Sequence, residues 1–237
     1  ELEQYLDAKA LVDQIVLSKP KNVDPYIICT DLSIQLSDAI GAVSCAEDGL
    51  ILHQNNVKLR YLLAKAYILA GIEDQGLIEF QSVLNSQPDD HHMRLNIAND
   101  MLAMKLFEQA LENFNVVLQA QPSSAQASIG KATSLLKLDR DDEAKAIAIK
   151  LSANTETKAD GYYVLGKIAL KQEKYTEAIL RLTRASKVNP ENIDAWVSMA
   201  NAYIELNKPD KAMTGLIQGI KTNPESFDLQ LLAGQIE

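Results

Sequence analysis

Several features that define common protein classes are scarce in this sequence. Only two cysteines, Cys29 and Cys45, occur among 237 residues, which is too few for a disulfide framework and lacks the paired spacing of a zinc site. We expect both to be buried, reduced thiols, because a free cysteine commonly packs as a small apolar side chain. No apolar run approaches the roughly 18 to 20 residues of a membrane-spanning helix, and no basic segment followed by an apolar core marks a signal peptide. No direct membrane insertion is therefore expected.

Basic residues are also outnumbered. The chain has 23 Lys and Arg against 32 Asp and Glu, which gives a formal net charge of −9 at pH 7. Nucleic-acid affinity comes mostly from neutralisation of phosphates by Lys and Arg. The charge therefore disfavours DNA or RNA as a partner, and no nucleic acid is expected.

Motifs that carry catalysis or hold cofactors are missing as well. There is no G-x-S-x-G or H-E-x-x-H motif. The segment GYYVLGK (161–167) fits G-x-x-x-x-G-K, but Ile168 stands where a phosphate-binding loop has Ser or Thr. The segment DDHH (89–92) contains metal-ligand residue types, yet adjacent His side chains diverge on a helix, so an acidic helix N-terminus is the favoured interpretation. The sequence predicts no enzyme activity, no cofactor and no metal site.

What the sequence does contain is a period of 34 residues. Steps of this length from Ala8 reach only Ala or Gly: Ala42, Gly76, Ala110, Ala144, Ala178 and Ala212. Proline recurs in the same frame: Pro20, Pro88, Pro122, Pro190 and Pro224. A fixed short period indicates repeats stacked on one another rather than one enlarged core. Gln54 and Glu156 replace the proline, so irregular helix ends or stacking are expected in repeats 23–56 and 125–158.

Within a repeat, apolar residues follow helical spacing. In 195–220, one helical face is formed by residues at i, i+3, i+4 and i+7: Trp196, Met199, Ala200 and Tyr203. After a polar break that contains Pro209, Ala212 and Leu216 begin a second face, and proline is tolerated in the first turn of a helix. No stretch shows sustained alternation, so no strands are expected. Each repeat is predicted to be a pair of helices.

We number each repeat from 1, with position 1 at Val23, Val57, His91, Ala125, Ala159 and Ile193. The Ala8 series then falls at position 20, and position 8 carries a second, mostly small series: Thr30, Ala64, Ala98, Ala132, Gly166, Ala200 and Gly234. Two antiparallel helices approach closely only where side chains are small, and overpacking such a contact costs about 1 to 3 kcal/mol. These positions are therefore expected to be helix–helix contacts.

With these residues, the sequence resembles the tetratricopeptide-repeat family, whose 34-residue repeat is a helix–turn–helix. Tyr26, Tyr162 and Trp196 match its bulky position 4, from which Arg60, Arg94 and Ser128 depart, and Tyr67 and Tyr203 match its aromatic position 11. The resemblance covers essentially the whole chain and implies an all-α, right-handed superhelical solenoid of antiparallel helix pairs. We expect one array over 1–237: a partial repeat 1–22, repeats 23–56, 57–90, 91–124, 125–158, 159–192 and 193–226, and a partial repeat 227–237.

Both ends fall inside a repeat, and the last segment, FDLQLLAGQIE, has no polar cap. Terminal repeats normally present a polar outer face, because an uncovered apolar face would otherwise contact water. The sequence is therefore expected to be a fragment of a larger protein that can self-associate through its uncapped ends.

The resemblance also implies where a partner binds, because the first helices of such repeats line the concave side. Positions 5 and 12 are apolar in every repeat, which could equally serve to pack neighbouring first helices, whereas position 9 is polar throughout. The candidate partner-binding residues are Tyr61, Lys65, Asn96, Asn99, Thr133, Tyr163, Lys167 and Asn201. Basic residues of the central repeats would make this groove locally positive and favour an acidic and apolar segment: Lys58, Lys65, Lys137, Lys167 and Lys171.

The sequence therefore predicts a protein–protein interaction scaffold that binds a partner peptide or helix in its concave groove. The alternative is a structural spacer or assembly module of a larger bacterial envelope or polysaccharide-secretion protein. The family's clamp for C-terminal carboxylates is not matched, because Tyr61 and Lys65 stand where Lys and Asn are required. The compartment, cytoplasm or bacterial periplasm, is left open.

Overall fold

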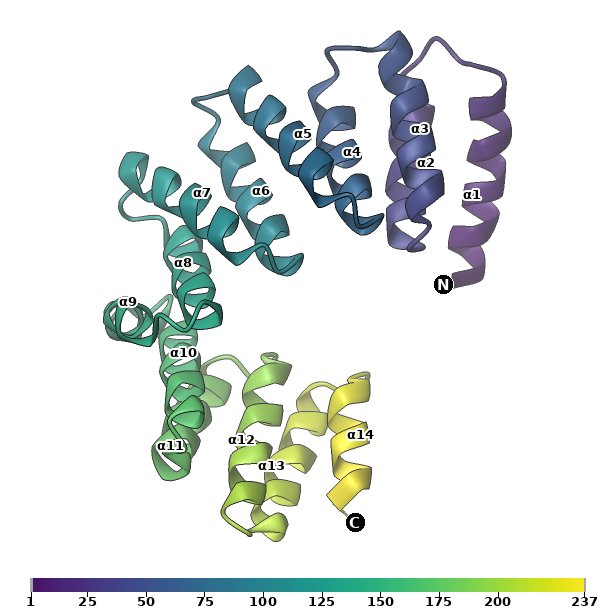
Figure 1. The fold of residues 1–237 in the computed structure, drawn as a ribbon. Helices are drawn as coiled ribbons and strands as arrows, with labels where there is room; N and C mark the ends of the chain where they lie inside the picture. The colour runs from purple at the N-terminus through teal and green to yellow at the C-terminus, as the bar shows by residue number, and fades with distance from the viewer. Residues whose placement is uncertain (1, 237) are drawn as a thin grey trace. The chain divides into compact units, whose positions relative to one another are not determined.

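A computed structural model describes residues 2–236, and these residues form α-helices joined by short connections (Figure 1). Within that range there are fourteen helices and no strands, which confirms the all-α prediction. None of these helices is long and apolar enough to cross a membrane. The chain forms two compact units, Glu1–Asp100 and Met101–Glu237. We call them the N-terminal body and the C-terminal body and describe each by itself.

Both bodies contain consecutive helices that pack against one another as antiparallel pairs, such as α4 with α5 and α10 with α11. The N-terminal body contains α1 (Leu2–Leu17), α2 (Asp24–Gln35), α3 (Ala39–Leu52), α4 (Val57–Leu69), α5 (Glu73–Ser86) and most of α6 (His91–Ala103). The C-terminal body contains α7 (Phe107–Ala120), α8 (Ala125–Lys137), α9 (Asp141–Ala153), α10 (Lys158–Lys171), α11 (Tyr175–Val188), α12 (Ile193–Glu205), α13 (Pro209–Thr222) and α14 (Phe227–Ile236). First helices of successive repeats also touch, as α2 does with α4 and α10 with α12.

The turn between the two helices of each repeat depends on one residue in the left-handed conformation. This residue recurs every 34 positions with φ between 56° and 77°: Ser37, Gly71, Lys105, Asp139, Glu173 and Asn207. The next N–H donates to a carbonyl five residues back, as from Lys174 to Ala169 at 2.9 Å. This is the hydrogen bond of a Schellman motif, which ends a helix and caps its last carbonyls. Only one of the six residues is glycine, the residue that adopts this conformation without steric cost.

The connection between repeats ends in a side chain that caps the next helix. The capping oxygen accepts a hydrogen bond from the backbone N–H three residues on in five places: Asn56, Asp90, Ser124, Asn192 and Ser226. Asn22, before α2, instead accepts from the Asp24 N–H two residues on. Lys158 takes this place before α10, which starts one residue earlier in the repeat, and α9 has 13 residues rather than 14. The expected irregular helix end is thus found near Glu156, where the four-residue connection begins and ends one residue earlier in the repeat, whereas the connection that contains Gln54 has its ordinary place.

The small residues at positions 8 and 20 are contacts between helices, as predicted. In every complete repeat both are buried, and most of the alanines have no exposed surface. Gly166 shows how close the helices approach, because a Cβ there would lie 2.7 Å from Leu182 Cγ. The outermost members, Ala8 and Gly234, are not buried, since no further repeat packs over them in the described residues.

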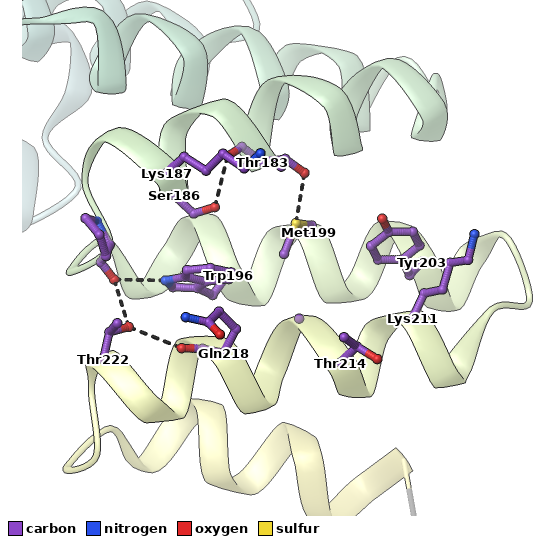
Figure 2. A pocket seen from close by; sticks show the side chains of 12 residues that line it. Thr183, Ser186, Lys187, Trp196, Met199, Tyr203, Lys211, Thr214, Gln218 and Thr222 are labelled. Carbon is purple, nitrogen blue, oxygen red and sulfur yellow. Dashed lines mark hydrogen bonds between the residues drawn. The ribbon is translucent and has the colours of Figure 1, made fainter.

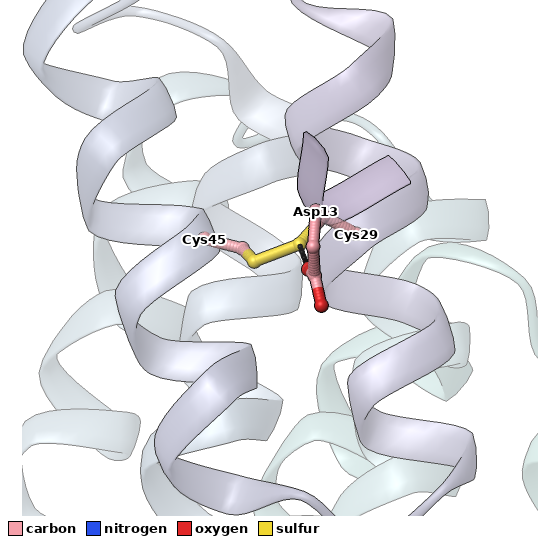
Figure 3. Close-up of side chains that lie close together, drawn as sticks. All are labelled: Asp13, Cys29 and Cys45. Atoms are coloured by element: carbon pink, nitrogen blue, oxygen red, sulfur yellow. Dashed lines mark hydrogen bonds between the residues drawn. A yellow bond between two sulfur atoms is a disulfide. The ribbon is translucent and has the colours of Figure 1, made fainter. Parts of the chain in front are cut away.

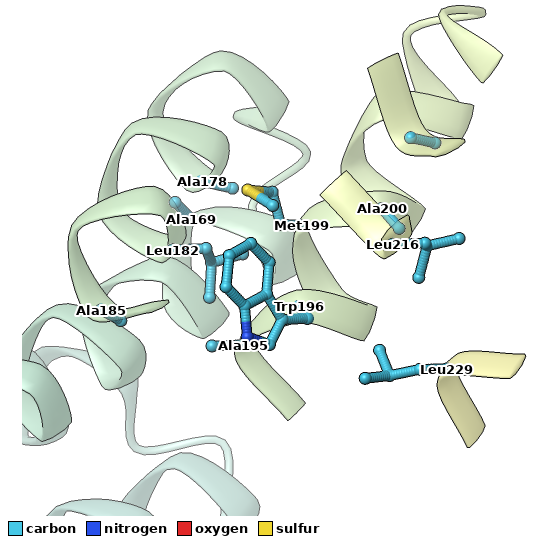
Figure 4. Packing of buried hydrophobic residues seen from close by; sticks show 11 residues of the cluster. Ala169, Ala178, Leu182, Ala185, Ala195, Trp196, Met199, Ala200, Leu216 and Leu229 are labelled. Carbon is cyan, nitrogen blue, oxygen red and sulfur yellow. The ribbon is translucent and has the colours of Figure 1, made fainter. Parts of the chain in front are cut away.

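Large residues in the core are matched by small ones on the facing helix. A Cβ at Gly219 would lie 2.9 Å from Trp196 Cγ, and a Cβ at Gly49 would lie 2.7 Å from Tyr26 Cβ. In repeats that lack an aromatic residue at position 4, the place of these glycines is taken by a larger residue: Val83, Val117 or Leu151. Close packing requires that an aromatic side chain at position 4 faces a small residue on the second helix. Figure 4 shows Trp196 in the core cluster of the C-terminal body.

The prediction of two reduced cysteines is wrong. Cys29 on α2 and Cys45 on α3 are joined by a disulfide, with Cα atoms 5.9 Å apart, and Asp13 of α1 lies beside it (Figure 3). The antiparallel packing of the two helices places positions 7 and 23 of a repeat opposite each other. A separation of 16 residues in the sequence contains no sign of this register.

Candidate partner-binding surface

The eight candidate residues lie on first helices, whose exposed side we call the first-helix surface. In the N-terminal body, Tyr61 and Lys65 are on α4, and Asn96 and Asn99 are on α6. In the C-terminal body, the other four are on three helices: Thr133 on α8, Tyr163 and Lys167 on α10, and Asn201 on α12.

Tyr61 and Lys65 form one cluster with an acid that the sequence had not indicated. The Tyr61 hydroxyl donates to Asp100 Oδ2, and Lys65 Nζ lies 3.3 Å from Asp100 Oδ1. Lys65 Nζ also lies 5.5 Å from the centre of the Tyr61 ring, within the range of a cation–π contact. The ring itself packs against Phe80 of α5, with centroids 5.9 Å apart. The phenol is therefore held on three sides and has a defined orientation.

The environment of Tyr61 opposes its ionisation. Burial raises the pKa of the Tyr61 hydroxyl well above its ordinary value of 10.0, and the hydrogen bond to Asp100 and the charges of Asp100 and Asp31 raise it further. A phenol with a raised pKa stays a neutral hydrogen-bond donor. Tyr61 is accordingly suited to binding and not to proton abstraction.

The C-terminal body contains a related cluster three repeats later. Lys167 Nζ lies 6.0 Å from the centre of the Tyr163 ring and donates to Ser198 Oγ at 3.2 Å. The Tyr163 hydroxyl lies 3.4 Å from Asp194 Oδ2. Both α4 and α10 thus carry a Tyr–Lys pair at i and i+4, in contact with side chains of the next first helix. The sequence predicted these four residues as candidates, but the contacts with Asp100, Asp194 and Ser198 depend on how neighbouring repeats stack.

Burial dominates the electrostatics of this second cluster. It raises the pKa of the Tyr163 hydroxyl, and the charge of Asp194 acts in the same direction. Burial lowers the pKa of the Lys167 ammonium, an effect that Asp194 opposes and Lys137 reinforces. No carboxylate of the described residues forms a salt bridge with Lys167, so its charge is only partly compensated.

Ion pairs weaken the local positive charge that the sequence predicts for the groove. Lys65 is paired with Asp100, and Lys171 lies 2.5 Å from Asp139 and 2.8 Å from Asp141. Counting charges along the sequence treats these lysines as unpaired, because their acidic partners lie on other helices or in a turn. Lys58, Lys137 and Lys167 form no salt bridge within residues 2–236, and they carry the remaining positive charge of this surface.

Two cavities open between first helices. One of about 480 Å³ in the N-terminal body is lined by side chains of α2, α4 and α6, among them Tyr61, Lys65 and Asn96. The other, of about 390 Å³ in the C-terminal body, lies between α8 and α10 and is lined by Leu136, Lys137, Lys167, Leu170 and Lys171. Asn99 and Asn201 are exposed outside these cavities, and the Thr133 hydroxyl is bonded to the Ile129 carbonyl at 2.9 Å.

The segments that suggested other chemistry are structural. Residues 161–167 lie inside α10, and a Cβ at Gly161 would lie 2.3 Å from the Ser152 backbone nitrogen, so this glycine serves helix packing and not a phosphate loop. Asp90 caps α6 by accepting from the Met93 N–H at 2.9 Å, as expected of an acidic helix N-terminus.

One group of potential metal-ligand atoms is present in the described part of the chain. Atoms of Asp13, Cys29 and Cys45 lie within 4.8 Å of one another. Because the two sulfurs are bonded to each other, they offer no thiolate ligands. The group therefore does not fit a metal ion in this state.

Comparison with known proteins agrees with this architecture. A tetratricopeptide-repeat family model matches residues 169–236. A solved tetratricopeptide repeat protein from Parabacteroides merdae superposes with a TM-score of 0.70 over 98% of this chain and 92% of its own, at 13% identity. The described residues therefore have the fold of a tetratricopeptide-repeat array.

Other known proteins are similar to this chain at low identity. A tetratricopeptide-repeat protein from Thermus thermophilus superposes with a TM-score of 0.60 over 76% of this chain and 98% of its own, at 16% identity. In sequence, a DnaJ homolog subfamily C member 7 homolog from Schizosaccharomyces pombe is 23% identical over 82% of this chain and 44% of its own length. The array thus spans less than half of that relative. The fold is that of a protein–protein interaction scaffold, a class that is generally non-enzymatic.

Proposed function

We propose that each body of this array binds a segment of a partner protein on its own part of the first-helix surface, with its Tyr–Lys pair as the anchor. The observation that carries the proposal is the recurrence of the same pair on α4 and α10, half-buried and held by the next repeat. A tyrosine that is already oriented offers a large contact area at low cost in conformational entropy. Interfaces commonly concentrate their binding energy in such aromatic residues.

The polar residues beside the tyrosines suit a peptide backbone. Asn96 lines the cavity next to Tyr61, and Asn99 is exposed one turn further along α6. An amide side chain offers both a donor and an acceptor, so it can bond an extended backbone without selecting particular side chains. The asparagines would thus contribute to affinity, and the neighbouring cavities would select the partner's side chains.

The C-terminal body favours an acidic and apolar partner segment. In its cavity, Lys137 and Lys167 lie beside Leu136 and Leu170. Burial lowers the pKa of Lys167, and a partner carboxylate would stabilise its charged form. Attraction of this kind steers association and weakens as salt is added.

The test is the triple substitution Lys65→Ala, Asn99→Ala and Lys167→Ala. Stable partners would be identified by affinity capture from the source organism with the parent array, followed by binding of each purified partner to both arrays. We expect affinity to fall about tenfold or more with the helical circular-dichroism signal unchanged. The matched control is Lys145→Ala, Asn85→Ala and Lys221→Ala on exposed parts of second helices. Equal loss in both variants, or no loss in the first, would contradict binding on the first-helix surface.

A second candidate function is an assembly module of a bacterial envelope protein, and the Cys29–Cys45 disulfide favours it. Disulfides persist mainly in oxidising compartments such as the periplasm and are rare in the cytosol. Alkylation of free thiols during lysis of the source organism, followed by mass measurement, separates the two cases. Two alkylated cysteines would count against the envelope function, and two unmodified cysteines would support it.

A further inference from the structure

A cavity of about 640 Å³ lies in the C-terminal body between α11 and α13, with α12 as its floor (Figure 2). Three side chains of α12 form this floor: Trp196, Met199 and Tyr203. None of the eight residues of the first-helix surface lines the cavity. It is therefore a separate feature from the surface described above.

One side chain that lines this place in other repeats is missing here. Gly215 stands at position 23, where the other complete repeats carry a larger residue: Cys45, Glu79, Asn113, Ile147 and Arg181. A Cβ at Gly215 would lie 2.9 Å from Met199 Cε, so even one added methyl would reach the floor. The equivalent cavity of repeat 125–158, which Ile147 lines, has a volume of about 350 Å³. The cavity beside Gly215 is thus the larger of the two.

The floor is held in place by hydrogen bonds that do not use the open face of the cavity. Trp196 Nε1 donates to the Pro190 carbonyl at 2.9 Å, and Asn223 Nδ2 donates to the same oxygen at 2.9 Å. Thr183 Oγ1 lies 3.3 Å from Met199 Sδ. Because the only donor of the indole is occupied, Trp196 offers the cavity an apolar ring. A preformed apolar floor is typical of a binding pocket of this volume.

The rim of the cavity carries charge of one sign only. Lys187 of α11 and Lys211 of α13 line it, and no Asp or Glu is among the lining residues, although the chain has a net charge of −9. Figure 2 shows Lys211 toward the Tyr203 end of the floor and Lys187 toward the Trp196 end. Neither lysine forms a salt bridge within residues 2–236.

We propose that this cavity is a second binding site, which takes a protein segment with a bulky apolar side chain between acidic residues. Trp196 and Tyr203 are seven residues apart, so the floor is about 10 Å long at the helical rise of 1.5 Å per residue. An extended chain covers that length in about three residues. Acidic side chains on either side of the apolar anchor would then reach Lys187 and Lys211. Exposed Thr214 and Gln218 on α13 offer hydrogen bonds to the segment's backbone.

The test uses the one tryptophan of the chain, which lies at the site and reports on it directly. Random dodecapeptides displayed on phage would be selected on the whole array, and enriched sequences without tryptophan would be synthesised and titrated against it. We expect enrichment of peptides with an aromatic or aliphatic residue flanked by Asp or Glu. Their binding should change the Trp196 emission and weaken as salt is raised.

Two variants separate this site from others. Gly215→Ile places in the cavity the residue found in the repeat of Ile147, and Lys187→Ala with Lys211→Ala removes the rim charge while leaving the packing unchanged. Each should weaken binding of the selected peptides about tenfold or more. Lys221→Ala, an exposed lysine of α13 outside the cavity, is the matched control and should leave binding unchanged. Circular dichroism and melting curves check folding, and the lysine variant keeps the test valid if Gly215→Ile is unstable.

Several results would overturn the proposal. One is a selection that yields no acidic and apolar peptides, or peptides that bind without changing the Trp196 emission. Undiminished binding by the double lysine variant would also refute it. So would peptides that lose binding in the triple variant of the first-helix surface but keep it in Gly215→Ile. A change in Trp196 emission with protein concentration alone would identify a second copy of this chain as the occupant instead.

Discussion

The substitution Glu173→Gly should stabilise the array, because Glu173 adopts a backbone conformation that disfavours any side chain. It has φ of 57° in the turn between α10 and α11, and the N–H of Lys174 closes the turn at 2.9 Å. The Glu173 side chain is exposed and forms no salt bridge within residues 2–236. Removing it therefore relieves the backbone without losing an ion pair.

The size of the effect follows from two opposing contributions. A non-glycine residue in the left-handed conformation costs about 1 to 2 kcal/mol. Glycine loses more conformational freedom on folding, which reduces the gain in the free energy of unfolding by about 0.5 to 1 kcal/mol. The net gain in the free energy of unfolding is then about 0.5 to 1 kcal/mol. Gly71 occupies the same turn one hundred and two residues earlier with φ of 77°, and a Cβ there would contact nothing within 4 Å. Gly71→Ala should therefore destabilise by about 1 kcal/mol through the backbone alone.

Urea unfolding followed by far-ultraviolet circular dichroism measures both changes. Glu173→Gly should move the midpoint upward and Gly71→Ala downward, with the slope unchanged. Glu173→Ala is the matched control, since alanine also carries a Cβ and should give little or no gain. If both glycine and alanine at this place stabilise equally, the side chain and not the backbone conformation is responsible, and the reasoning is wrong.

Three further predictions concern packing, protonation and the disulfide. Gly219→Val should lower stability by about 1 to 3 kcal/mol in urea unfolding, because its side chain would overlap Trp196. The hydrogen bond to Glu47 and burial raise the pKa of Tyr67 from 10.0 to about 12. Its hydroxyl should therefore stay mostly protonated near about pH 11 in the folded array. In an ultraviolet difference titration, Tyr67→Phe should have one tyrosine fewer that ionises above the ordinary pKa. Reduction of the Cys29–Cys45 disulfide should lower stability by about 3 kcal/mol, as expected for a loop of this length, measured by unfolding with and without reductant.

The sign of the pH effect follows from the direction of the shift. Because the pKa of Tyr67 is higher in the folded array, its contribution to stability is fully present below about pH 10 and is lost as the pH rises through about 12. Each of the three predictions has a contrary outcome. These outcomes are an unchanged midpoint for Gly219→Val, a titration curve that Tyr67→Phe leaves unaltered, and equal stability with and without reductant.

Local pattern predicted much of the fold. The period of 34 residues, the small residues at positions 8 and 20 and the helical spacing of apolar residues were sufficient to predict paired helices and their contacts, since each depends on sterics along one or two neighbouring helices. The left-handed turn residues recur with the same period but were not recognised, because five of the six are not glycine. The series of capping side chains is interrupted at Lys158, and this interruption, equally visible in the sequence, marks the irregular start of α10.

The tertiary structure decided what depends on residues of different helices meeting. Whether Cys29 reaches Cys45 is a matter of register between α2 and α3, and whether Lys65 keeps its charge free depends on Asp100 in the next repeat. Tyr61 and Tyr163 could be chosen from the sequence as candidates, but their orientation and raised pKa arise from burial between stacked repeats. Gly215 is visible in the sequence only as one glycine among ten. That it lines a cavity above Trp196 follows from the close packing of three helices, which no local pattern encodes.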